Sequence, residues 1–358
     1  MLESSVKASI ENRPMPEGGY AGGYISHVAD KVKGHRNIKD ESIKELLGQQ
    51  KATLDKLGVK YDRWFKESEL HDKGFVKRYI KQLEERGLTF NEGQAVWFKS
   101  SDFGDDKNRV LVKEDGSPTY FAADIAYHIN KYKRGYDMLI NVWGTDHHGY
   151  VKRLKSAITA LGYPAEKLEI IIGQLVALYR GKELVRMSKR TGEMITLDEV
   201  IDEIGAPAAR YFFVRNSPST HLDFDLELAK SRSMENPVYY VGYAHARIKS
   251  ILNEAKKAGI SPSSTKLSLL NKEPERRLML KLLKFKDEVE SAATAMQPHR
   301  LTAYAESLAQ IFHNYYHQYR VISDDRELSK ARLTLAKATS IVIRNVLKLL
   351  GIDAPEHM

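Results

Sequence analysis

The 358-residue sequence contains no cysteine. This absence excludes disulfide frameworks, cysteine-ligated zinc sites, iron–sulfur clusters and cysteine nucleophiles. The sequence also lacks a run of about 18 apolar residues and a charged-then-apolar leader, so we expect neither a membrane span nor secretion. Together these absences favour a cytoplasmic protein.

The composition indicates a folded, mildly basic protein. The hydrophobic fraction is 42% and the formal net charge is +9, which suits a chain of about two domains. Residues 231–358 carry most of the excess charge, with 20 Lys or Arg against 13 Asp or Glu, and they are rich in tyrosine. Basic groups neutralise phosphates and aromatic rings stack on unpaired bases, so this segment suits RNA. A solvated helical domain with a few spare lysines explains the charge equally well.

The hydrophobic pattern changes character along the chain. Helical spacing is present over 24–32 and 75–86, and two short alternating segments, 95–99 and 109–112, predict a small β element. Helices and buried strands then alternate, which predicts a parallel sheet with crossover helices; the segments are 121–131 (helix), 138–143 (strand), 151–161 (helix) and 168–178 (strand). Beyond residue 231 only helical periodicity remains, over 236–256, 274–296, 300–320 and 327–350. The predicted fold class is α/β over 1–230, followed by an all-α domain over 231–358.

Two pairs of histidines could be metal ligands by their closeness in sequence, but the sequence supports a metal site at neither pair. His147 and His148 follow the predicted strand 138–143, but neighbouring side chains in an extended segment point to opposite faces. His313 and His317 have the i, i+4 spacing of helical metal ligands, yet no Glu follows His313 and no third ligand lies nearby in sequence. A polar and aromatic helix face is the simpler interpretation of that second pair. We therefore predict no metal site.

One pentapeptide, Arg186-Met187-Ser188-Lys189-Arg190, closely resembles the KMSKS signature of class I aminoacyl-tRNA synthetases. Three longer stretches, 120–128, 141–150 and 235–247, and the ending 351–358 resemble arginyl-tRNA synthetase specifically. The resemblance runs over nearly the whole chain from about residue 60. It implies the second half of a Rossmann-like catalytic domain, preceded by an insertion remnant, and then a helical-bundle anticodon-binding domain.

The resemblance implies roles in the attack of an amino-acid carboxylate on the ATP α-phosphate. Lys189, supported by Ser188, would stabilise the charge that appears on the phosphates in the transition state. ATP contacts are implied at four positions: Gly144, Asp146, His147 and Met187.

Tyr120 and Asp124 are the implied arginine-binding residues. Their i, i+4 spacing places them on one helix face, where a carboxylate can take a guanidinium in a bidentate pair. Without the family, a surface Asp beside a half-buried Tyr would be the simpler interpretation.

The implied tRNA-binding residues are Tyr240, Tyr243 and Arg247, which supply stacking and phosphate-binding groups within about two turns, with His245 among them. The alternative is that Tyr239 and Tyr243 are core residues, and the sequence leaves this open.

The implied activity is that of an arginine–tRNA ligase, which attaches arginine to tRNA(Arg) at the expense of ATP. The expected partners are tRNA(Arg), arginine and ATP with Mg²⁺, with no bound organic cofactor and no membrane, and the full-length protein is expected to be a monomer.

The HIGH signature that class I synthetases also need does not occur in this sequence, and its nearest string, 33–36, lacks the first His. We therefore expect the C-terminal two-thirds of a family member, inactive alone. A non-catalytic tRNA-binding module is the main alternative. A ligase for another amino acid is disfavoured by Tyr120 and Asp124.

Overall fold

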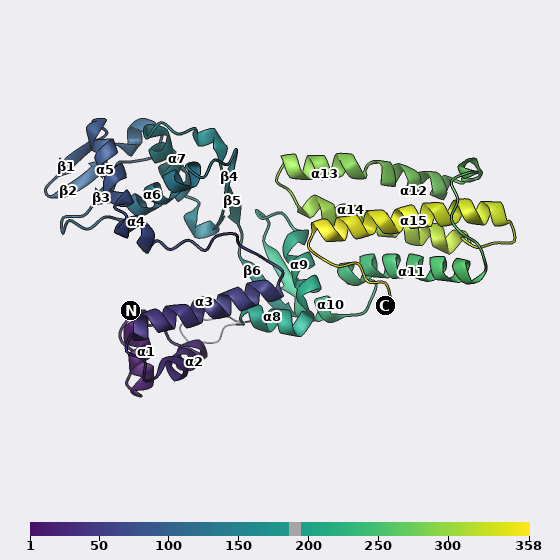
Figure 1. Cartoon of the computed structure of the whole chain (residues 1–358), viewed down its shortest axis with the longest axis horizontal. Coiled ribbons are helices and arrows are strands. Elements are labelled where there is room, and N and C mark those ends of the chain that lie inside the picture. The colour runs from purple at the N-terminus through teal and green to yellow at the C-terminus, as the bar shows by residue number, and fades with distance from the viewer. Residues whose placement is uncertain (186–194) are drawn as a thin grey trace. The chain divides into compact units, whose positions relative to one another are not determined.

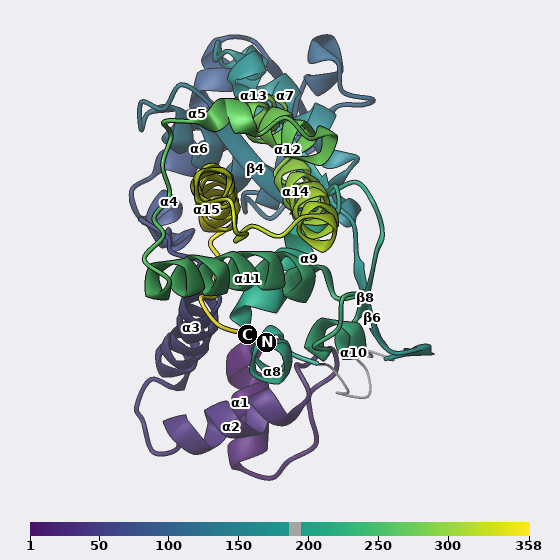
Figure 2. The ribbon, with the colours of Figure 1, turned by 90° about the vertical axis from the view of Figure 1, so that its right-hand side faces the viewer.

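The computed structural model describes residues 1–185 and 195–358. The chain forms two compact units. The first unit comprises residues 1–60, 176–217 and 222–358, and the second comprises residues 61–175 and 218–221. Figures 1 and 2 show the elements of both from two directions. No helix among the described residues is long and apolar enough to cross a membrane.

The second unit combines helices with two small sheets. An antiparallel sheet has the order β1-β2-β3, and β4 pairs with β5 in parallel. The elements in chain order are α4 (Ser68–Asp72), α5 (Phe75–Glu85), β1 (Thr89–Glu92), β2 (Ala95–Phe98), β3 (Arg109–Val112), α6 (Tyr120–Tyr132), β4 (Leu139–Gly144), α7 (Tyr150–Ala160) and β5 (Leu168–Gly173). The predicted small β element and the alternation of helices with parallel strands are therefore confirmed.

Burial follows the sequence pattern in the helices of this unit. The apolar positions of α5 are buried at helical spacing, and Gly87 after its end has a φ of +71°. That left-handed conformation favours glycine and closes the helix. Leu83 of α5, Ile125 of α6 and Leu154 of α7 are fully buried in one common core. The parallel pairing ends with Gly144 opposite Gly173, so both strands finish at the same edge.

The first unit begins with a small helical cluster. Helices α1 (Leu2–Ile10), α2 (Gly23–Val32) and α3 (Ile38–Lys56) pack on one another, and Val6 and Val28 lie at the centre of their apolar core. The remaining elements before the bundle are β6 (Val176–Arg180), β7 (Glu183–Leu184), α8 (Leu197–Ile204), α9 (Ala206–Arg215), β8 (Leu222–Asp225) and α10 (Leu226–Lys230). β6 pairs with β7 in antiparallel and with β8 in parallel.

The C-terminal part of the first unit is a helical bundle, as predicted. Its members are α11 (Pro237–Lys257), α12 (Glu273–Leu283), α13 (Phe285–Thr294), α14 (His299–Gln318) and α15 (Arg326–Leu349). In Figure 1, α11, α14 and α15 run side by side, and all three contact one another. Leu308 and Phe312 of α14 are fully buried in the bundle core.

The structure subdivides two segments that the sequence pattern joins. Residues 274–296 form α12 and α13, which are separated by a turn at Lys284. The apolar run 168–178 forms β5 and β6, which belong to different sheets. The break follows Gly173, where the backbone N–H of Gln174 donates to the carbonyl of Pro218 at 2.8 Å. Hydrophobicity alone cannot reveal such a change of partner.

Candidate active site

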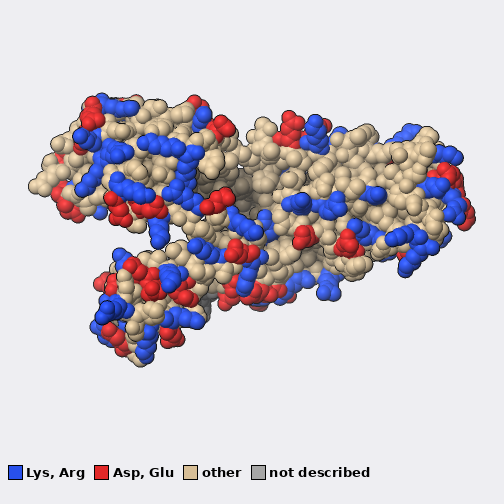
Figure 3. Space-filling model, viewed as in Figure 1, with Lys and Arg blue, Asp and Glu red and all other residues tan. Residues whose placement is uncertain are grey.

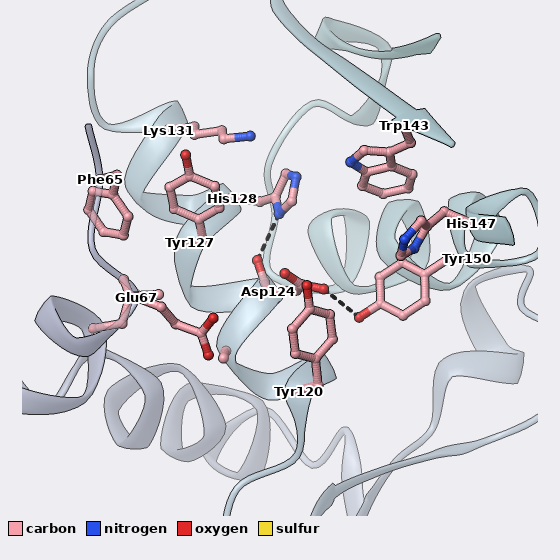
Figure 4. A pocket seen from close by; sticks show the side chains of 12 residues that line it. Phe65, Glu67, Tyr120, Asp124, Tyr127, His128, Lys131, Trp143, His147 and Tyr150 are labelled. Atoms are coloured by element: carbon pink, nitrogen blue, oxygen red, sulfur yellow. Dashed lines mark hydrogen bonds between the residues drawn. The ribbon is translucent and has the colours of Figure 1, made fainter. Parts of the chain in front are cut away.

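A pocket of about 330 Å³ lies in the second unit (Figure 4). Its walls come from the segment before α5, from α6, from the end of β4 and from the start of α7. Tyr120, Asp124 and His147, three of the residues predicted from the sequence, line it together.

The start of α6 positions Tyr120 and Asp124. Thr119 is the N-cap of α6, and its hydroxyl accepts from the N–H of Ala122 and donates to the carbonyl of Val110 in β3 at 2.9 Å. Such a cap satisfies a backbone donor that the helix leaves open and ties the helix end to the sheet. Tyr120 is 64% exposed, and Asp124 lies one turn further along the helix.

Asp124 sits in an environment that disfavours its negative charge. Burial raises the pKa of Asp124, the nearby carboxylate of Glu67 adds to the rise, and a hydrogen bond from Tyr150 opposes it. The Tyr150 hydroxyl donates to Asp124 Oδ2 at 2.8 Å. Figure 4 shows the Glu67 carboxylate pointing toward the first turns of α6. A cation bound in the pocket would relieve this charge imbalance.

A buried polar network supports the backbone of Asp124. The Nζ of Lys131 donates to Asn141 Oδ1 at 2.8 Å, so the amide nitrogen of Asn141, 2.7 Å away, is the donor to His128 Nε2. The Nδ1–H of His128 then donates to the carbonyl of Asp124 at 2.8 Å. These contacts assign a neutral His128 with its proton on Nδ1. Burial lowers the pKa of His128 to about 4 and that of Lys131 to about 8.

The neutral state of His128 predicts a pH-dependent stability. Its pKa in the folded chain lies below its ordinary 6.5, so the unfolded chain binds the proton more readily between pH 6.5 and 4. Stability should therefore fall as the pH drops through this window, by roughly 3 kcal/mol. We expect His128→Gln, whose amide can replace both hydrogen bonds, to lose this part of the pH dependence. Urea unfolding at pH 7 and pH 4.5, followed by tryptophan fluorescence, measures it.

The control for this prediction is His148→Gln, because His148 is exposed. That variant should keep the wild-type pH dependence. All three tryptophans, at positions 64, 97 and 143, lie in the second unit, so their fluorescence reports on the unit that contains His128. An unchanged pH dependence in His128→Gln would contradict the assignment.

Three of the four residues predicted to contact ATP, Gly144, Asp146 and His147, lie where β4 ends. Gly144 closes β4, and a Cβ atom at this position would lie 2.7 Å from the Asp146 carboxylate. The Asp146 side chain is 80% exposed and reaches His147 Nε2 at 3.5 Å. The His147 ring also packs near Trp143 and Tyr150, with ring centres 5.9 and 6.3 Å apart. His147 thus faces the pocket, whereas Gly144 and Asp146 stand just outside its wall.

The remaining predicted residues lie elsewhere. Met187, Ser188 and Lys189 are outside the described residues. Tyr240, Tyr243 and Arg247 are half-buried on α11 in the first unit. His245, which the sequence groups with them, is buried, and its Nδ1 donates to the carbonyl of Pro355 at 2.8 Å.

Tyr243 and Arg247 line a second cavity of about 620 Å³, within the helical bundle. The Arg247 guanidinium carbon lies 5.1 Å from the ring centre of Tyr243 and 5.6 Å from that of Tyr316. The ring of Tyr240 packs against His313, with centres 4.8 Å apart. Lys and Arg side chains are spread over the visible face of the bundle, with acidic side chains among them (Figure 3).

Three groups that shape the pocket are not predicted from the sequence. Glu67 lies in a segment with no clear periodicity, and Tyr150 is 26 residues from its partner Asp124. The His128 and Asn141 pair joins α6 to β4. Asn141 lies within an apolar strand segment, and a buried amide needs hydrogen-bond partners. That was the available sequence signal for a polar partner such as His128.

Comparisons with known proteins agree with this picture. Residues 21–223 match the family described as "tRNA synthetases class I (R), catalytic domain", and residues 241–358 match the "DALR anticodon binding domain". The chain is 48% identical to the arginine–tRNA ligase of Desulforudis audaxviator, over 96% of this chain and 64% of that protein. It is 51% identical to that of Moorella thermoacetica, over 88% of this chain and 57% of that protein.

Solved structures show the same likeness. An arginyl tRNA synthetase from Campylobacter jejuni superposes with a TM-score of 0.88 at 32% identity, and covers 100% of this chain and 81% of that chain. Thermus thermophilus arginyl-tRNA synthetase, at 22% identity and a TM-score of 0.76, shares the fold. The present chain spans less than two thirds of the length of the Desulforudis audaxviator and Moorella thermoacetica proteins. The predicted fold class is confirmed, and the chain belongs to the arginyl-tRNA synthetase family of class I aminoacyl-tRNA synthetases.

Proposed function

We propose that this chain carries the arginine-binding and tRNA-binding parts of an arginine–tRNA ligase, and that it uses ATP with Mg²⁺ as co-substrate. The observation that carries the proposal is the Asp124 carboxylate, which accepts from Tyr150 and lies near Glu67 in the pocket, and with which no Lys or Arg among the described residues forms an ion pair. The chain contains no His-x-Gly-His sequence. We therefore propose that it does not complete aminoacylation by itself.

The pocket fits a guanidinium better than an ammonium. Asp124 and Glu67 supply carboxylates, and the hydroxyl of Tyr120 adds a further acceptor at the rim. A planar guanidinium presents five donors in a fork that matches a carboxylate in two parallel hydrogen bonds, while an ammonium is a compact point charge. The aromatic walls of the pocket can also stack on a flat cation.

Ligand binding to the 358-residue chain tests this proposal. Isothermal titration calorimetry should detect arginine, whereas citrulline, which replaces the cation with a neutral group of the same shape, should bind at least about 100-fold more weakly. Lysine should also bind more weakly than arginine. Equal affinities for arginine and citrulline would contradict a guanidinium pocket. A chain that binds tRNA but neither arginine nor ATP would instead support the alternative, a non-catalytic tRNA-binding module.

We further propose that ATP binds at the carboxyl end of β4, which is where open α/β sheets hold their ligands. In this proposal Asp146 accepts from the ribose hydroxyls, Gly144 admits the nucleotide close to the backbone, and His147, which also lines the proposed arginine pocket, lies between the two ligands. Lys189, with Ser188 and Met187, is the proposed phosphate-stabilising loop. We also propose a cytoplasmic protein that is monomeric at full length.

For tRNA(Arg), we propose residues 231–358 as the binding domain, with Tyr240, Tyr243 and Arg247 in contact with RNA. The ring faces and guanidinium around the bundle cavity support this, because aromatic rings stack on bases and Arg neutralises phosphate.

Arg247→Met should weaken tRNA(Arg) binding at low salt, because it removes a phosphate-neutralising charge from the rim of the cavity. If Arg247 neutralises one phosphate, the slope of log K against log salt should also fall by about 1. Filter binding across a salt series measures both effects. Lys257→Met, which removes an exposed charge from the last turn of the same helix, is the matched control. Equal slopes in wild type and Arg247→Met would contradict the assignment of Arg247.

A further inference from the structure

Another cavity, of about 290 Å³, lies in the second unit and shares two walls with the arginine pocket. Tyr120 and Tyr150 line both spaces. The other lining residues of the new cavity are Val110, Thr119, Phe121 and two arginines, Arg109 of β3 and Arg153 of α7. It is therefore an aromatic and basic space that adjoins an acidic one.

The two arginines differ in their partners. Arg109 donates to both carboxylate oxygens of Asp105, at 2.8 and 3.0 Å, and also contacts Asp106. Burial opposes ionisation of Asp105, yet the hydrogen bonds from Arg109 and from Asp106 hold the pKa of Asp105 well below its usual range. The charge of Arg109 is thus already neutralised by protein groups.

Arg153 has no such neutralisation. Among residues 1–185 and 195–358 no carboxylate forms an ion pair with it, and its buried Nε has no hydrogen-bond acceptor. Its guanidinium carbon lies 4.8 Å from the ring centre of Tyr150, so the group lies over a ring of the shared wall. A half-buried guanidinium that lacks an anion loses part of its hydration, and a contact with a ring offsets only part of that cost. A bound anion would supply the missing partner.

We propose that Arg153 and this cavity form a subsite for a nucleotide phosphate, beside the guanidinium pocket. The inference rests on the proposed function, whose two phosphate-bearing substrates are ATP and tRNA. Arg is suited to phosphate because its fork donates two parallel hydrogen bonds, and the exposed ring of Tyr120 offers a face to a base or a ribose. Carboxylates lie on one side of the wall formed by Tyr120 and Tyr150, and arginines lie on the other. This arrangement suits a reaction that joins a cationic amino acid to an anionic nucleotide.

Two substitutions with a matched control test the subsite. Arg153→Met keeps a side chain that can cover the Tyr150 ring but removes the charge, and Arg153→Lys retains a charge. Lys152→Met removes an exposed charge from the adjacent position of α7 and serves as the control. Each variant of the 358-residue chain is titrated with ATP and Mg²⁺, with a tRNA(Arg) transcript, and with the same transcript lacking its 3′-terminal nucleotide. Melting temperatures establish that each variant is folded.

The two phosphate sources give different results. If ATP supplies the phosphate, Arg153→Met should weaken ATP binding by about tenfold or more and leave tRNA binding unchanged. If the tRNA end supplies it, the wild type should prefer the intact transcript over the shortened one, and Arg153→Met should lose that preference. Arg153→Lys should lie between Arg153→Met and the wild type, and Lys152→Met should change each affinity by less than about twofold.

Unchanged affinities for ATP and for both transcripts in Arg153→Met would overturn the subsite, as would equal losses in Lys152→Met. Should Arg153→Met fail to fold, Arg153→Gln replaces it with the same criteria. Arginine binding, measured on the same preparations, separates this inference from the proposed function. A wild type that does not bind arginine contradicts the proposed function, whereas arginine binding together with nucleotide binding that is independent of Arg153 contradicts only the subsite.

Discussion

Replacing Asp124 with asparagine is expected to weaken arginine binding by about 100- to 1,000-fold. The change removes one partner of a partly buried, hydrogen-bonded charge pair, which costs about 3–4 kcal/mol. The asparagine keeps the shape of the side chain and can still accept the Tyr150 hydroxyl hydrogen, so the fold should persist. Calorimetric titration with arginine measures the effect, and citrulline should bind the variant about as weakly as it binds the wild type.

Two further variants sharpen this test. Asp137→Asn removes a carboxylate from an exposed position of the same unit and should leave arginine affinity within about twofold. Tyr150→Phe removes the hydroxyl that orients the carboxylate while the charge remains, so a loss of about 5- to 10-fold is expected. If Asp137→Asn weakened arginine binding as much as Asp124→Asn, arginine affinity would depend on the overall negative charge of the unit and not on Asp124.

Much of the fold is predictable because local patterns and tertiary burial agree. The apolar stripe of α5 buries the face that its helical period predicts. β4 departs from its pattern, because Ile140 and Val142 of its apolar run are exposed while Asn141 is buried. Helix α3 has a weaker pattern, because Ser42 is its only buried residue and its apolar side chains are half-buried or exposed. Such a helix carries little hydrophobic periodicity. The side chain of Asn37 accepts from the N–H of Asp40 and marks the start of the helix. A single capping residue is a weak sequence signal for a helix.

The site divides in the same way. Tyr120 and Asp124 come together because the i, i+4 geometry of one helix suffices. Glu67 and Tyr150 reach the same pocket only through the packing of other segments around α6, and no local pattern contains that information. The unpaired state of Arg153 is likewise a property of the folded chain, because it depends on which carboxylates the fold brings near, and Arg109 illustrates the opposite outcome.

The helical bundle contains a buried ion pair whose disruption should have the largest effect on stability. Arg332 Nε donates to Glu275 Oε1 at 2.8 Å, and the side chains are 7% and 0% exposed. Arg332 also donates to the carbonyl of Arg320 at 2.8 Å, and Glu275 accepts from the N–H of Lys272 at 3.0 Å. The pair thus joins α12, α15 and the chain segment that follows α14.

Arg332→Met should destabilise the bundle by about 3–5 kcal/mol, because it leaves the Glu275 carboxylate buried without a cation. The double substitution Glu275→Gln with Arg332→Met removes both charges and should recover part of that loss. The exposed pair of Glu273 and Arg277 in α12 provides the control. Its side chains are 71% and 69% exposed, and their charged atoms are 3.7 Å apart. Arg277→Met should therefore change stability by less than about 1 kcal/mol.

Urea unfolding distinguishes this local effect from a general loss of structure, because the two units carry different probes. The tryptophans all lie in the second unit, whereas the long helices of the first unit contribute to far-ultraviolet circular dichroism. In Arg332→Met the circular-dichroism transition should move to lower urea while the fluorescence transition stays in place. Coincident shifts of both transitions would show that the two units unfold together, and an unchanged dichroism midpoint would show that the pair contributes no net stability over methionine.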